Sequence, residues 1–251
     1  MNKQKIAKLS EKIVPAFGAD NIVCVLFHGS ILFNPHIPPH DADLVIVLKK
    51  RNAEDCSNLR KMVRQVRLTE LPVHLHLIYM DEIPENADFF SIHTCGAFFT
   101  CHLRQAEPLY GENVFDKTVG PSEYQLQLSL LQKVQQYTFQ MRNLVFALDR
   151  RTENELLWAR KKSVVMLKDL LLSTGILLQR EETIISKSLE VFYDFSNDEK
   201  AFLEALQKPW VKPDSEKLER VFMTRCLQVH ERAYGIMRKR ISEKHHCRFL
   251  G

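Results

Sequence analysis

Two short apolar runs joined by a polar segment constrain the fold of this chain more than any other feature. The first run ends in Gly29-Ser30, and the second opens with Asp41 and Asp43. Short β-branched runs between turn residues predict buried strands. Side chains two positions apart on a strand share a face, so the two aspartates should lie side by side. Neighbouring carboxylates repel each other, and a bound divalent cation is the simplest way to offset that cost.

This spacing resembles the signature of the nucleotidyltransferase superfamily, which includes DNA polymerase beta and the aminoglycoside and minimal nucleotidyltransferases. The signature is Gly-Ser, a spacer of about this length, and Asp-x-Asp or Asp-x-Glu at the head of a strand. Gly29, Ser30, Asp41 and Asp43 match it position by position. The resemblance implies that the two aspartates bind Mg²⁺. It also implies that Gly29 and Ser30 hold the phosphates of a nucleoside triphosphate.

A third strand, predicted over residues 73–79, departs from the family. Most active members carry a third carboxylate there, which completes the metal site and can deprotonate the acceptor hydroxyl. In this chain the position is His74, with His76 next on the same face, and the nearest acids, Glu70 and Asp81, lie outside the strand core. A histidine can act as a general base but does not neutralise a second hard cation. We therefore place His74 with the catalytic aspartates and keep a catalytically impaired, nucleotide- or partner-binding member as the alternative.

The two halves of the chain differ in pattern. Predicted strands alternate with helices up to about residue 115, whereas residues 121–251 show only helical periodicity. We expect an α+β fold, with a mixed-sheet nucleotidyltransferase-like domain over 1–115 and a helical bundle over 121–251 that binds substrate or partner. The bundle resembles the HEPN-type domain that follows many small nucleotidyltransferases. The acceptor should lie between the two domains. The main helices are predicted at about 52–68, 87–104, 154–173 and 214–243.

Composition limits the compartment and the partners. No apolar stretch approaches the roughly 20 residues of a membrane span, and the first residues lack the apolar core of a signal peptide. The six cysteines have no framework spacing, which indicates a reduced, cytoplasmic protein. Lys and Arg number 13 against 14 Asp and Glu in residues 1–120, and 22 against 17 in residues 121–251. We expect neither a membrane nor nucleic acid as a partner.

The resemblance implies an Mg²⁺-dependent transfer of a nucleoside monophosphate, with AMP from ATP as the expected case. The acceptor would be a hydroxyl of a small molecule, such as an aminoglycoside, or of a partner protein. Lys187 resembles the lysine of a Ser-Lys pair that starts a helix in some aminoglycoside adenylyltransferases, and it could meet a phosphate as a point charge. A solvated lysine is the alternative. The oligomeric state stays open, a homodimer included.

Other candidate sites have simpler explanations. Arg225 and His230 fit the Arg-x₄-His spacing of ribonuclease-type HEPN domains, although residues five apart are not well aligned on one helix face. Histidines in the first half could form a zinc site, but their spacing matches no standard ligand pattern. These are His28, His36, His40, His74 and His76. Basic residues near the C-terminus could bind RNA or could simply complement a helix dipole. These are Arg232, Arg238, Lys239, Arg240, Lys244 and Arg248.

Overall fold

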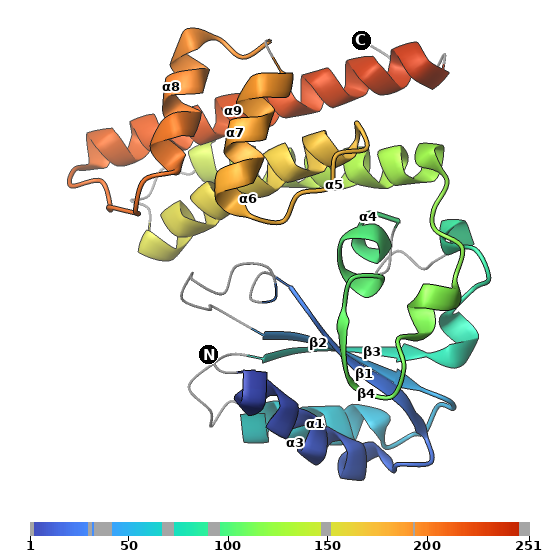
Figure 1. Cartoon of the computed structure of the whole chain (residues 1–251). Helices are drawn as coiled ribbons and strands as arrows, with labels where there is room; N and C mark the ends of the chain where they lie inside the picture. The colour runs from blue at the N-terminus through green and yellow to red at the C-terminus, as the bar shows by residue number, and fades with distance from the viewer. Residues whose placement is uncertain are drawn as a thin grey trace. The chain divides into compact units, whose positions relative to one another are not determined.

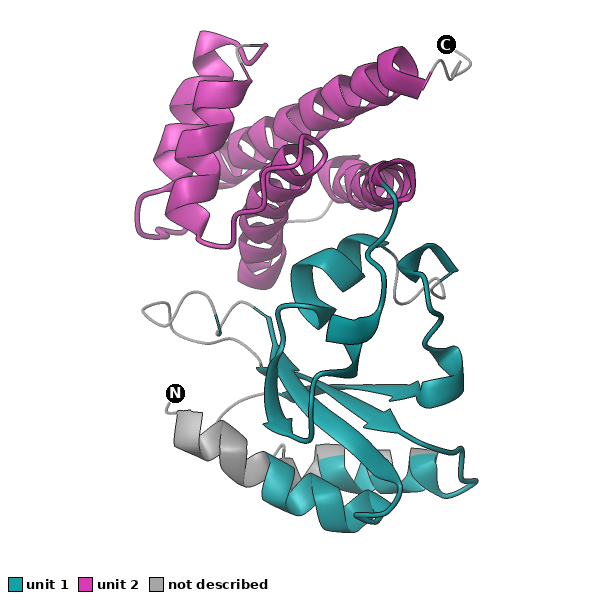
Figure 2. Ribbon diagram, turned by 45° about the vertical axis from the view of Figure 1, so that its right-hand side comes forward, with its two compact units in different colours: residues 1–122 teal, residues 123–251 magenta. Residues whose placement is uncertain are grey.

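The computed structural model of the chain forms two compact units, residues 1–122 and 123–251 (Figure 2). The first is a mixed sheet with helices and the second is helical, which confirms the predicted α+β fold class. The first unit extends beyond residue 115 because the amide of Val119 donates to the carbonyl of Glu85 over 3.0 Å. The structure describes residues 3–29, 32, 42–66, 73–89, 96–146, 152–192 and 194–245, of which 3–9, 56, 59 and 63–66 are described by their backbone alone.

The first unit is built on a four-stranded sheet with the order β3-β2-β1-β4. β1 runs antiparallel to both of its neighbours, whereas β2 and β3 are parallel. Parallel neighbours need a crossover connection, which the helix α3 supplies. The strands are β1 (Ile22–His28), β2 (Ala42–Leu48), β3 (Val73–Tyr79) and β4 (Glu107–Tyr110), and the crossover helix is α3 (Asp55–Val66). β4 was not predicted: it is short and contains Pro108, which an edge strand tolerates.

Each face of the sheet has its own apolar core (Figure 1). Ile13 and Phe17 of α1 pack with Met62 of α3 against one face. Phe99 and Leu103 pack against the other. The elements are α1 (Lys3–Phe17), the 3₁₀ turns η1 (Met80–Glu82), η2 (Ala87–Phe89) and η5 (Val114–Lys117), the short helix α4 (Gly96–Phe98) and the π-helical turn η4 (Phe99–Leu103). The continuous helix predicted over 87–104 is therefore wrong, because three short elements occupy its described part.

A glycine closes the end of the edge strand. Gly111 follows β4 with φ at 68°. A Cβ at this position would collide with the carbonyl oxygen of Val23 on the neighbouring strand. Only glycine combines this backbone conformation with so close an approach, which explains its place after Leu109 and Tyr110.

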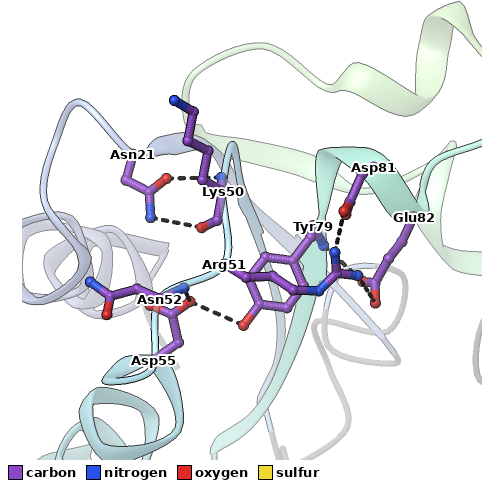
Figure 3. A network of polar contacts seen from close by, with 8 residues as sticks. All are labelled: Asn21, Lys50, Arg51, Asn52, Asp55, Tyr79, Asp81 and Glu82. Atoms are coloured by element: carbon purple, nitrogen blue, oxygen red, sulfur yellow. Dashed lines mark hydrogen bonds and ion pairs between the residues drawn. The ribbon is translucent and has the colours of Figure 1, made fainter.

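The far end of the parallel pair, where β2 and β3 finish, is held by a polar network (Figure 3). The guanidinium of Arg51 donates to the carboxylates of Asp81 and Glu82, and it lies 4.7 Å from the centroid of the Tyr79 ring. The Tyr79 hydroxyl donates to the buried carboxylate of Asp55 over 3.0 Å. The polar groups at this end thus find their partners within the unit, and they hold β2 and β3 in register.

The second unit consists of helices whose ends carry the expected local signals. At the start of α6 the Thr152 hydroxyl accepts from the amide of Glu155, whose carboxylate accepts from the amide of Thr152. The helices are α5 (Glu123–Phe146), α6 (Glu153–Leu172), α7 (Glu181–Val191), α8 (Asn197–Leu206) and α9 (Glu216–His245). Residues of α5, α6 and α9 share one core around Met141, Leu156 and Met223. Among the described residues, every helix is too short or too polar to span a lipid bilayer.

Candidate functional site

Three side chains stand in one row across the sheet at the near end, where β2 and β3 begin. His28 of β1 is in register with Asp43 of β2, and Asp43 is in register with His74 of β3. Strand alternation places all three on the face that η4 covers, together with Cys24 and Val45. The sequence therefore places an acid between two imidazoles. The strands of His28 and Asp43 are antiparallel, and those of Asp43 and His74 are parallel.

The carboxylate of Asp43 lies between the turn after β1 and the imidazole of His74. Gly29 has φ at 96°, and a Cβ there would collide with Oδ2 of Asp43. Glycine is thus required both by the backbone and by the carboxylate above it. On the other side, Oδ1 of Asp43 lies 3.4 Å from Nδ1 of His74. Asp43 is 22 % exposed and His74 is 60 % exposed, so solvent and ligands can reach both.

Two of the predicted site residues, Ser30 and Asp41, lie outside the described residues, so their proposed roles in phosphate and Mg²⁺ binding stay predictions. Within the described residues, no group of three or more histidines, cysteines or acids could hold a metal ion. The partly exposed oxygens of Asp43 are hard donors of the type that Mg²⁺ uses, together with phosphate oxygens. The described member of the predicted Mg²⁺ site, Asp43, is therefore of a chemical type that fits the ion.

Three further aromatic rings gather around His28, and two of them were not predicted. The ring of His28 lies 5.6 Å from that of His76, 5.5 Å from that of Phe98 and 5.3 Å from that of His102, between centroids. We call these four residues the ring cluster. His102 is half-buried, because η4 turns its ring toward β1.

His28 is the buried member of the ring cluster, with 3 % of its surface exposed. Neither of its ring nitrogens has a hydrogen-bond partner within the described part of the chain. Burial and, to a smaller extent, the proximity of His76 lower the pKa of His28 to about 3, so the ring is neutral at physiological pH. Its burial follows from the sequence, because it ends the continuous apolar run of β1.

The candidates in the second unit are engaged or buried. The ammonium of Lys187 pairs with Glu190, and Arg225 pairs with Asp198 over 3.3 Å. His230 has no exposed surface, and burial lowers its pKa to about 3. A phosphodiester could not reach this ring, so the arrangement does not support a ribonuclease site.

Several of the basic side chains near the C-terminus make contacts within the second unit. Arg232 pairs with Glu199 and Lys244 with Glu123, and the Arg240 guanidinium lies over the ring of Phe192. Arg248, His36 and His40 lie outside the described residues, so the predictions that involve them remain untested.

The comparisons with known proteins identify the fold. No family model matches the chain, and no curated protein matches it. A solved structure of spectinomycin adenyltransferase AAD(9) from Enterococcus faecialis, with ATP and spectinomycin, matches with a TM-score of 0.63. The match has 8 % sequence identity and covers 92 % of this chain and 100 % of that one. The chain therefore has the nucleotidyltransferase fold that the Gly29-Ser30 and Asp41-x-Asp43 pattern predicted.

Proposed function

We propose that this protein is an Mg²⁺-dependent nucleotidyltransferase that moves AMP from ATP to a hydroxyl of an acceptor. The observation that carries the proposal is the row in which Asp43 lies between the Gly29 turn and His74. The similarity of the fold to that of an adenyltransferase supports the same reaction class. The acceptor is a small molecule or a partner protein.

The row separates the proposed phosphate site, at the Gly29 turn, from the proposed acceptor site, at His74. Phosphates bind at the Gly29 turn, where the absence of a Cβ allows a close approach to the backbone. Mg²⁺ held by Asp43 and Asp41 would neutralise the charge that develops on the phosphates. Lys187 is a further proposed phosphate contact, and a phosphate would have to replace its present partner, Glu190.

In-line displacement determines where the acceptor must stand. The attacking and leaving oxygens lie on opposite sides of the α-phosphorus. Because the leaving pyrophosphate is held at the end of β1, the hydroxyl approaches from the side of β3, where His74 stands. The hydroxyl oxygen bonds to the α-phosphorus, and the bond from that phosphorus to the bridging oxygen breaks. Pyrophosphate leaves with the electron pair, and the hydroxyl proton passes to Nε2 of His74, since Nδ1 faces Asp43.

Incubation with ATP labelled in the α-phosphate, Mg²⁺ and a panel of acceptors tests the proposal. Asp43→Asn should reduce label transfer by at least about a hundredfold, because it removes a charged metal ligand. Asp116→Asn makes the same change at an exposed acid in η5 and should leave transfer intact. Transfer that survives Asp43→Asn unchanged would refute the assignment.

A second candidate function is nucleotide binding without transfer. It is favoured by one observation, the imidazole of His74 at the position where most active members carry an acid. Calorimetry separates the two candidates. ATP binding that is indifferent to Mg²⁺, with no release of pyrophosphate over hours in the presence of acceptors, would identify a binding protein.

A further inference from the structure

The ring cluster has an accessible outer side. His76 is exposed and Phe98 is half-buried, and their ring centroids lie 5.8 Å apart. His102 continues the surface, with its ring 5.1 Å from that of Phe98. His28 lies beneath these rings and contacts all three. The result is a surface of phenyl and imidazole rings on the same face of the sheet as Asp43.

The ring cluster is not what packing alone would select. On the same face of β1 the buried positions before His28 are Cys24 and Leu26, which need no hydrogen-bond partner. A buried polar group without a partner costs about 1–3 kcal/mol. His28 has two such nitrogens within the described part of the chain, and both are buried. This buried imidazole lies beneath the rings of His76, Phe98 and His102, and the accessible side of those rings is the candidate binding surface.

If the proposed function holds, the position of the ring cluster places it next to the acceptor rather than the triphosphate. His76 lies two residues after His74 on β3, and Phe98 lies against it. In-line attack brings the acceptor from the β3 side, so an acceptor placed at His74 must lie next to the ring cluster. The triphosphate, by contrast, is proposed to bind at the Gly29 turn, and His28, the residue before that turn, is buried and offers it almost no surface.

The chemistry of the surface selects the type of acceptor. Its rings offer π faces for stacking at offset or edge-to-face geometry. None of its four side chains carries a carboxylate, so it provides no anionic contact for a polycation such as an aminoglycoside. We propose that the ring cluster is the acceptor subsite and that the acceptor is a neutral molecule whose hydroxyl is borne on, or next to, a planar aromatic ring. This inference rests on the proposed function.

Binding measured by NMR titration tests the inference separately from catalysis. The probe is N-acetyl-tyrosinamide, which is neutral and carries a hydroxyl on an aromatic ring. N-acetyl-serinamide is the matched control, since it keeps the amide and the hydroxyl and lacks the ring. In the presence of Mg²⁺ and ATP, the tyrosine probe should bind about five- to tenfold more tightly than the serine probe.

Two conservative variants should remove this preference. Phe98→Leu keeps the apolar volume and loses the aromatic face, and His76→Gln changes an exposed residue, so both should fold. Each should bring the affinity for the tyrosine probe close to that for the serine probe, with ATP binding unchanged. His245→Gln, in the second unit, should retain the preference. Equal affinity of the wild-type protein for the two probes, or a preference that survives both ring-cluster variants, would overturn the inference.

The outcomes also separate the inference from the proposed function. If the wild-type protein does not bind ATP with Mg²⁺, the proposed function fails and the inference fails with it. If AMP is transferred to a cationic aminoglycoside and the tyrosine probe shows no preference, the inference fails while the proposed function stands. Transfer of label to the phenolic hydroxyl, reduced by Phe98→Leu, supports both.

Discussion

The two ends of the parallel strands β2 and β3 use polar residues in opposite ways. At the far end, Arg51, Tyr79 and the acids around them satisfy one another within the unit (Figure 3). At the near end, Asp43 is partly exposed beside a glycine turn, and the nitrogens of the buried His28 have no partner within the described residues. The far end therefore holds the strands in register, whereas the near end leaves the carboxylate of Asp43 partly exposed and the buried imidazole of His28 without a partner among the described residues.

The largest expected effect comes from adding one methyl group at the near end. Gly29→Ala should reduce nucleotidyl transfer by about a hundredfold, because the new Cβ displaces the carboxylate of Asp43. Gly18→Ala is the matched control: its φ is 81°, but a Cβ there meets nothing within 4 Å. It should lower the free energy of unfolding by about 1 kcal/mol and leave transfer intact. Equal losses of activity in the two variants would show that backbone strain, rather than the position of Asp43, is responsible.

A buried histidine away from the site provides a structural reference for His28. Burial lowers the pKa of His230 to about 3, so the unfolded chain binds a proton below pH 6.5 that the folded chain does not. This difference leaves the free energy of unfolding unchanged above pH 6.5 and lowers it progressively as the pH falls from 6.5 toward 3. The expected slope is up to about 1.4 kcal/mol per pH unit. Denaturant unfolding of His230→Gln at several pH values should show a smaller slope, and an unchanged slope would contradict this origin.

Replacing His28 of the ring cluster with an apolar residue should change stability and acceptor binding in opposite directions. His28→Leu eliminates two buried nitrogens that have no partner among the described residues, and it should raise the free energy of unfolding by about 1 kcal/mol. The same variant should weaken acceptor binding, because the rings of His76, Phe98 and His102 lose the layer beneath them. Thermal denaturation checks the expected gain in stability, and titration of the same sample with the tyrosine probe checks the expected loss of affinity. A less stable variant would show that His28 serves packing.

The smallest expected effect lies at the far end. Tyr79→Phe removes the hydrogen bond to the buried carboxylate of Asp55 and should cost about 1 kcal/mol of stability or slightly less. The near end does not depend on this hydroxyl, so nucleotidyl transfer at saturating substrate should be unchanged. Steady-state assays and denaturant unfolding give the two values. A loss of transfer larger than tenfold would mean that the two ends are coupled.

The positions of Asp43 and His74 in the row could be predicted from the sequence because they depend on local rules, whereas the place of His28 beside Asp43 was not predicted. Apolar runs with turn residues locate β1, β2 and β3, and strand alternation places Asp43 and His74 on one face. The edge strand around Pro108 could not be found, since four residues without apolar alternation acquire their structure only by pairing with β1. The ring cluster was missed because Phe98 and His102 reach β1 from the short helix α4 and the π-helical turn η4 that follows it. No periodic pattern in the sequence marks such a turn.

Mg²⁺-dependent ATP binding by two matched variants tests the functional difference between the ends most directly. Asp43→Asn changes the near end and Asp81→Asn makes the same substitution at the far end. Calorimetry should show that Mg²⁺ strengthens ATP binding in the wild-type protein and in Asp81→Asn, and that this dependence disappears in Asp43→Asn. If Asp43→Asn retains the full Mg²⁺ dependence, or if Asp81→Asn loses it, the near end is not the metal and nucleotide site.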